Sequence, residues 1–119
     1  MDALIIHEHW LNKILNREKT WEIRGSRTSK RGEIALIQKG SGKIFGTGKL
    51  TDVIGPLTLG DLRSNIDKHQ ILSNELSNVL ARYIKPYAWV LNDVRQFDTP
   101  VAYTHPKGAV IWVKLGNSE

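Results

Sequence analysis

The segment Ile14–Arg24, which reads ILNREKTWEIR, decides the fold because a helix gives way to a strand within it. Apolar residues recur at helical spacing up to Asn16 and predict a short helix after the first strand. From Lys19 to Arg24, β-branched and aromatic residues predict a strand. The charged residues of this segment therefore stand at the junction of two elements.

Strands are predicted on both sides of this junction. They cover Ala3–Ile6, Glu33–Gln38, Lys43–Ile54, Tyr87–Phe97 and Ala109–Leu115. Gly46 and Gly48 interrupt the longest early strand and predict a bulge or sharp bend, as small barrels use at their corners.

Helices are predicted between the two blocks of strands. Thr58-x-x-Asp61 resembles a capping box at the start of a short helix. A second helix should begin at Ser73, carry an apolar stripe as far as Tyr83 and end before Pro86. This order of elements predicts an α+β fold in which about five to six strands form a small β-barrel.

Length and composition restrict the class of protein. The 119 residues suit one domain, residues 1–119, since domains usually have about 100–150 residues. Hydrophobic residues make up 40% and charged residues 24%, which excludes wholesale disorder. No apolar run could span a membrane and no signal peptide is evident, so a cytoplasmic protein is expected. The chain has no cysteine, which excludes a disulfide-linked partner, a thiol nucleophile and a cysteine zinc site.

Positive charge is concentrated in the first half of the chain. The net charge is +5, but Lys13–Lys49 holds ten basic and three acidic residues and alone carries +7. Such a one-sided distribution suits an anionic partner such as RNA or a nucleotide, because neutralised phosphates release counterions. A solvated, solubilising surface is the alternative interpretation.

Residues 17–24 resemble the signature segment of ASCH domains, usually written G-x-K-x-x-E-x-R. Lys19, Glu22 and Arg24 match three of its four fixed positions, while Arg17 stands where the family usually has glycine. That glycine would follow the helix in a left-handed conformation, a role that we expect Asn16 to take. The closing segments 87–91 and 105–113 also resemble compact bacterial members, so the resemblance covers nearly the whole chain.

The resemblance implies a fold and two classes of function. ASCH domains belong to the PUA-like superfamily, which implies a small barrel with helices packed at its openings and a pocket lined by Lys19, Glu22 and Arg24. The first hypothesis is a module that binds RNA or a modified nucleoside and acts in RNA metabolism. The second is a hydrolase, since some members are amidohydrolases that act on N4-acylated cytidine and others are associated with ribonuclease activity. A protein-interaction adaptor is a third interpretation, which an exposed apolar patch would favour.

The candidate catalytic residues are Lys19, Glu22 and Thr20. Strand alternation places Lys19 and Glu22 on opposite faces, so Lys19 must lie at a bent start of the strand to join Glu22. The amidohydrolase branch implies a threonine nucleophile where this chain has Glu22. Glu22 would instead act as a general base for water, or Thr20 would serve as a displaced nucleophile. A surface ion pair between Lys19 and Glu22 is the simpler alternative.

The other candidate ligand-binding residues are basic or aromatic. Arg24, Arg27, Lys30 and Arg31 are expected to bind phosphates, Trp10 to stack on a base, and His105 and Lys107 to reach the barrel mouth. A solubilising loop, a core tryptophan and a surface turn are the respective alternatives. Trp21, Trp89 and Trp112 lie in predicted strands and are expected to be packing residues.

No metal or cofactor site is predicted. His7 and His9 would share one face of a strand, but no third ligand stands at an interpretable spacing. The chain has no glycine-rich phosphate loop and no nucleophile elbow. The sequence leaves the ligand and the oligomeric state open.

Overall fold

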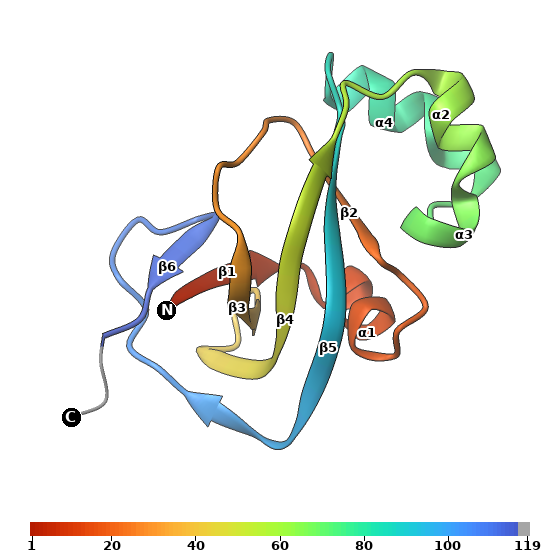
Figure 1. Ribbon diagram of the computed structural model, residues 1–119. Coiled ribbons are helices and arrows are strands. Elements are labelled where there is room, and N and C mark those ends of the chain that lie inside the picture. The colour runs from red at the N-terminus through yellow and green to blue at the C-terminus, as the bar shows by residue number, and fades with distance from the viewer. Residues whose placement is uncertain (117–119) are drawn as a thin grey trace.

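A computed structural model describes residues 1–116 and shows a mixed α+β fold built on one curled sheet (Figure 1). Six strands of the described chain form this sheet: β1 (Asp2–Ile6), β2 (Trp21–Arg24), β3 (Gly32–Gln38), β4 (Lys43–Ile54), β5 (Tyr87–Ala102) and β6 (Trp112–Lys114). Four α-helices accompany it: α1 (Glu8–Leu15), α2 (Leu59–Ser64), α3 (Ile66–His69) and α4 (Leu76–Arg82), with a 3₁₀ turn at Ser73–Glu75.

The strand order is β2-β5-β4-β3-β1-β6, with β1 and β3 parallel and the other pairs antiparallel. The sheet curls into a half-barrel, which brings β2 at one edge close to β1 near the other edge. Arg24 Nη2 of β2 donates to the Ile5 carbonyl of β1 at 2.9 Å. The irregularity of β4 lies at the glycines where a bend was predicted. A Cβ on Gly46 would stand 2.3 Å from the Arg95 carbonyl oxygen, so only glycine allows β4 and β5 to approach there.

The helices pack at two places on this sheet. Figure 1 shows α1 beside the lower part of β5, and α2, α3 and α4 as one insert beyond the ends of β4 and β5. Inside the curl, α1 residues Leu11, Ile14 and Leu15 pack with strand residues that include Leu91. The insert packs on the opposite face of β2 and β5 through a second cluster around Trp21 and Leu62. No helix of the described chain is long and apolar enough to cross a membrane.

Most of the predicted elements are confirmed, including the capping box. The Thr58 hydroxyl accepts from the Asp61 N–H at 3.1 Å, and the Asp61 carboxylate accepts from the Thr58 N–H at 2.8 Å. The bulge near Gly46 and Gly48 is confirmed by register shifts between β4 and β5 on both sides of Thr47.

Two predicted strands have different lengths in the structure. β5 continues to Ala102 past Pro100, because β2 pairs only with residues 87–90 of β5 and leaves the later part as an edge where proline is tolerated. β6 is shorter than predicted. Ala109 belongs to a turn, in which its N–H donates to the Pro106 carbonyl at 3.2 Å.

One predicted helix differs in its bounds, and one predicted conformation was wrong. The helix predicted from Ser73 to before Pro86 is present, but it begins as a 3₁₀ turn and ends at Arg82, where Tyr83 takes an extended conformation. Asn16 is not left-handed; its φ is −76°, and Arg17 takes that conformation with φ 65°. The chain therefore reverses at Arg17 itself, where the signature has glycine.

Candidate functional site

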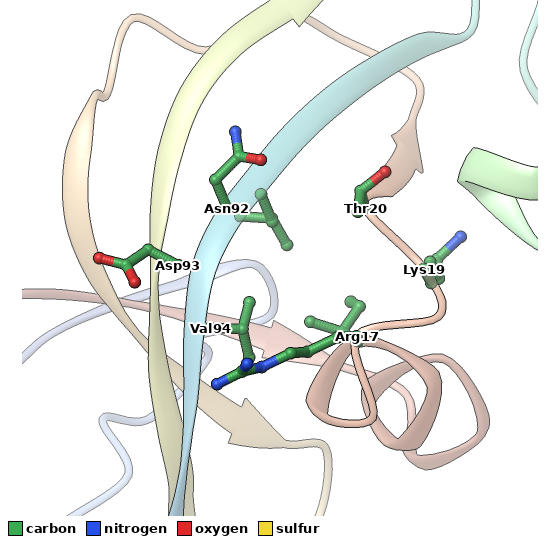
Figure 2. Close-up of a pocket in the computed structure, with 8 residues that line it drawn as sticks. Arg17, Lys19, Thr20, Asn92, Asp93 and Val94 are labelled. Carbon is green, nitrogen blue, oxygen red and sulfur yellow. The ribbon is translucent and has the colours of Figure 1, made fainter.

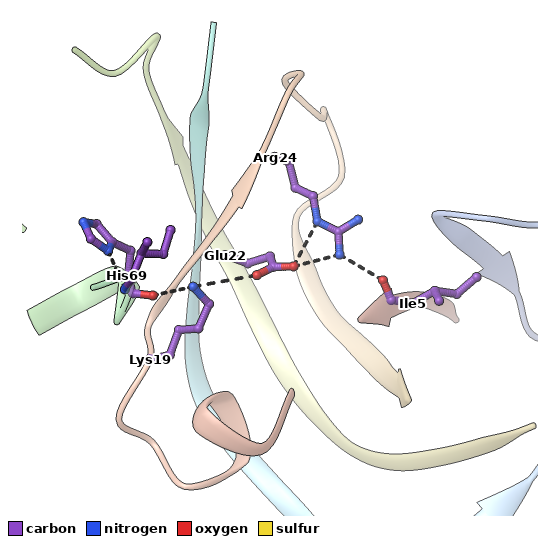
Figure 3. A network of polar contacts seen from close by, with 6 residues as sticks. Ile5, Lys19, Glu22, Arg24 and His69 are labelled. Atoms are coloured by element: carbon purple, nitrogen blue, oxygen red, sulfur yellow. Dashed lines mark hydrogen bonds and ion pairs between the residues drawn. The ribbon is translucent and has the colours of Figure 1, made fainter. Parts of the chain in front are cut away.

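Lys19 lies just before β2 and is 1% exposed. Its Nζ donates to the His69 carbonyl at 2.5 Å, lies 3.9 Å from Glu22 Oε1, and stands 4.5 Å from the centre of the Trp10 ring (Figure 3). The lysine therefore joins the last residue of α3 to the carboxylate of β2.

Glu22 and Arg24 continue the network on β2. Glu22 Oε2 accepts from Arg24 Nε at 3.0 Å and from Nη2 at 2.8 Å, and Nη2 also reaches the Ile5 carbonyl of β1. Glu22 is 4% exposed, so the acid lies between two cations almost without water. We call Lys19, Glu22 and Arg24 the signature network; it links the helical insert, β2 and β1.

The reversal at Arg17 explains how Lys19 and Glu22 meet. The N–H groups of Glu18 and Lys19 both donate to the Lys13 carbonyl at 3.0 Å, which holds the chain against the end of α1. The next N–H, of Thr20, donates to the Lys68 carbonyl at 2.9 Å. Lys19 is thus outside the strand and its alternation, as the expected bent start required.

Burial controls the protonation of two groups here. Burial lowers the pKa of Lys19 to about 8; Glu22 opposes this effect, and Arg24 and Lys13 add to it. Burial also lowers the pKa of His69. Since the Ile71 N–H donates to His69 Nδ1 at 2.9 Å, the neutral ring carries its hydrogen on Nε2 and donates it to the Leu62 carbonyl at 2.7 Å.

A cavity of about 160 Å³ lies beside the network, between the end of α1 and β5 (Figure 2). Lys19 and Thr20 line it, together with Arg17 and the β5 residues Asn92 and Asp93. Glu22 and Arg24 do not line it. The structure thus brings the three signature residues into one network, and of these only Lys19 reaches this cavity.

The loop between β2 and β3 carries the remaining predicted basic residues. Arg27 donates to the Gly55 carbonyl at 2.9 Å and lies 5.0 Å from the centre of the Tyr87 ring. Lys30 pairs with Asp2 at 3.1 Å and lies 5.3 Å from the centre of the Trp112 ring. Arg31 is exposed and donates to the carbonyls of Thr28 and Lys30 within its own loop.

The other predicted residues lie elsewhere. Trp10 is half-buried, and Lys19 and His9 already contact its ring. His105 is exposed in a turn, 2.6 Å from the Tyr103 hydroxyl and 3.0 Å from the Ala109 carbonyl, and Lys107 is exposed in the same turn. Within residues 1–116, no hydrogen bond or ion pair links this turn to the signature network.

The tryptophans differ from one another in burial. Trp21 and Trp89 are buried, as predicted, but Trp112 is only half-buried because the short β6 lies at the edge of the sheet. Trp112 stacks on Trp89 with ring centres 5.7 Å apart. Within residues 1–116, no group of three or more His, Cys, Asp or Glu residues is placed to hold a metal ion.

Sequence reasoning missed the aromatic residues beside the loop between β2 and β3, and it missed two residues that line the cavity. Tyr87 and Trp112 pair with basic side chains that are far away in sequence, which no local pattern indicates. Asn92 and Asp93 line the cavity, and Asp93 has a φ of 51°, a conformation that its residue type permits but does not demand. The sequence carried one signal for the cavity, namely Arg17 at the position where the signature has glycine.

Comparisons with known proteins agree with this architecture. The family model described as the ASCH domain matches residues 4–101. The crystal structure of ASCH from Zymomonas mobilis superposes with a TM-score of 0.73 at 13% identity, covering 97% of this chain and 87% of that one. A tyrosine-to-phenylalanine variant of the Zymomonas mobilis protein gives 0.70 at 14% identity, covering 85% and 74%. No curated protein matches the sequence.

Proposed function

Because the chain belongs to the ASCH domain family, we propose that it binds RNA or a modified nucleoside, and that phosphates bind to the face formed by residues 25–31 and the aromatic rings beside them. We call this surface the basic face. It consists of Arg27, Lys30 and Arg31 with Tyr87 and Trp112.

The pairing of cations with aromatic rings on one face carries this proposal. Arg27 lies over Tyr87 and Lys30 over Trp112, and Arg24 lies 5.5 Å from the centre of the Trp89 ring between them. Single-stranded RNA is recognised by such surfaces, because bases stack on rings and guanidinium planes while cations bind the phosphates.

The charges of the two arginines are available to a phosphate. Arg27 and Arg31 donate to backbone carbonyls, which position a guanidinium without neutralising it. Lys30 differs because Asp2 neutralises it, and Arg24 differs because Glu22 does. We therefore assign the phosphate contacts to Arg27 and Arg31.

The test is binding of a fluorescently labelled single-stranded RNA at about 50 and about 200 mM salt. Replacing both Arg27 and Arg31 by alanine should weaken binding about tenfold at the lower salt concentration. The matched control replaces Arg63 and Arg95, two exposed arginines outside the basic face that lie over no aromatic ring of the described chain, and should change affinity less than about twofold. Equal losses in the two double variants would reject the basic face as the binding site.

A hydrolase is the second candidate, and the buried Lys19 beside Glu22 favours it. An amine with a pKa of about 8 exchanges protons near neutral pH, as a general acid or base must. The assay is release of cytidine from N4-acetylcytidine beside cleavage of a labelled RNA, with Glu22→Gln and Thr20→Ala as variants. Activity lost with Glu22→Gln favours water activated by the carboxylate, and activity lost only with Thr20→Ala favours a threonine nucleophile.

A further inference from the structure

The cavity between α1 and β5 lies apart from the basic face and has an apolar wall. Ile14, Leu91 and Val94 form this wall, and the volume is about 160 Å³. An enclosed cavity of about 150 Å³ lined by apolar residues holds one benzene ring. This cavity has a similar volume and is open to solvent, so it suits one planar ring whose substituents extend into the solvent.

Arg17 supplies a positive charge at this cavity. Figure 2 shows its side chain running from the end of α1 toward Val94 on β5. Arg17 is exposed, and within residues 1–116 its guanidinium makes no hydrogen bond and no ion pair. Its φ of 65° is a conformation that glycine adopts more readily than a residue with a side chain. A cation thus stands beside the cavity at a position whose backbone favours glycine.

The remaining polar groups around the cavity do not neutralise Arg17. Asp93 is the acid of the lining, and Lys49 pairs with it at 3.3 Å. The Asn92 amide nitrogen donates to the Thr51 hydroxyl at 2.7 Å, which orients the amide and leaves its carbonyl oxygen as an acceptor. The Thr20 hydroxyl and Lys19 also line the cavity, and the Lys19 ammonium is engaged by the His69 carbonyl and Glu22. The cavity therefore combines an apolar wall, one guanidinium without an acidic partner, and the polar groups of Asn92 and Thr20.

We propose that this cavity binds a small anionic ring compound, one planar ring that carries a carboxylate or a phosphate. The ring packs on Ile14, Leu91 and Val94, and the anionic group pairs with Arg17. An N–H or O–H on the ring donates to the Asn92 carbonyl. This site is additional to the basic face, so RNA binding and ring binding can fail independently.

Titration of the full chain with benzoate and with its neutral analogue benzamide tests the charge. The wild type should bind benzoate about tenfold more tightly, because only the carboxylate pairs with a guanidinium. Arg17→Gly should abolish this preference. Its melting temperature should stay the same or rise, because glycine relieves the left-handed conformation, so a loss of binding cannot come from unfolding. Arg63→Ala, which removes an exposed arginine outside the cavity, should keep the preference.

The origin of the anion is tested with one further ligand. Uridine 5′-monophosphate binding more tightly than benzoate would identify the ligand as a nucleotide, and the reverse order would identify it as a free aromatic acid.

Three results would overturn the proposal: equal affinity of the wild type for benzoate and benzamide, an unchanged preference in Arg17→Gly, or no binding of any ring compound at about 5 mM. RNA binding measured on the same variants keeps the two sites distinct. Loss of ring binding with intact RNA binding rejects the cavity alone.

Discussion

Two groups of basic residues lie within a few positions of each other in the sequence and in opposite surroundings in the structure. Lys19 and Arg24 of the signature network are enclosed with Glu22, and their side chains connect α3, β2 and β1. Arg27 and Arg31 of the basic face lie at the surface and donate only to backbone carbonyls. The signature residues therefore connect parts of the curled sheet, whereas the neighbouring loop exposes its charges to solvent.

The signature network connects β1 and β2, which are far apart in the strand order. Arg24 joins them through its bond to the Ile5 carbonyl, and Glu22 holds Arg24 in place. Lys19 attaches the helical insert at the other end through the His69 carbonyl. One acid thus positions the two cations that hold three parts of the chain together.

The largest effect is expected from Glu22→Ala. It leaves Lys19 and Arg24 without their acid, and an uncompensated buried charge costs about 3–5 kcal/mol. Urea denaturation measures the free energy of unfolding. Glu18→Ala removes an exposed acid from the same segment and should change it by less than about 0.5 kcal/mol. Equal stability of the two variants would show that the network does not organise the sheet.

The stacked tryptophans should show the next largest effect. Trp89→Ala empties a site that is 2% exposed and should cost about 3–5 kcal/mol. Trp112→Ala removes the half-buried partner and should cost only about 1–2 kcal/mol. Chemical denaturation of both variants checks the order, and a larger loss for Trp112→Ala would place the centre of this core at β6.

The sequence predicted the fold where local signals and the tertiary structure agree. The apolar periodicity of α1, the capping box at Thr58 and the glycines at 46 and 48 all describe local geometry, and all three are confirmed. The length of β5 depends on which strand lies beside it, so Pro100 gave a misleading signal. The effect of a neighbouring strand on the length of β5 can be recognised only when the order of strands in the sheet is known.

The candidate site was less predictable because it depends on contacts between distant residues. Spacing indicated that Lys19 and Glu22 would meet only if the strand began with a bend, and the reversal at Arg17 provides that bend. The sequence could not indicate that a carbonyl of α3 would bind Lys19, or that the β1 backbone would bind Arg24. Burial of the network therefore became visible only in the assembled structure.

A pH dependence of intermediate size is expected from Lys19. Its pKa is about 8 in the folded chain and about 10.5 when unfolded, so between these values the unfolded chain binds more protons. Stability should therefore rise with pH across this range by about 1–3 kcal/mol relative to Lys19→Met, which lacks the titrating group. Denaturation of both proteins at several pH values gives the difference. A constant difference from pH 8 to pH 10.5 would show that burial does not shift the lysine.

The smallest effect on stability is expected from Arg31→Ala, and it separates the two groups of residues most sharply. The side chain is exposed and bonds only within its own loop, so the free energy of unfolding should change by less than about 0.5 kcal/mol. RNA binding should nevertheless weaken, and the slope of log affinity against log salt should decrease in magnitude by about 0.7, the value for one phosphate contact to a single strand. Arg31→Lys keeps the charge and should keep the slope, although it loses the paired geometry of the guanidinium. An unchanged slope in Arg31→Ala would remove this residue from the phosphate-binding surface and leave Arg27 as its remaining uncompensated cation.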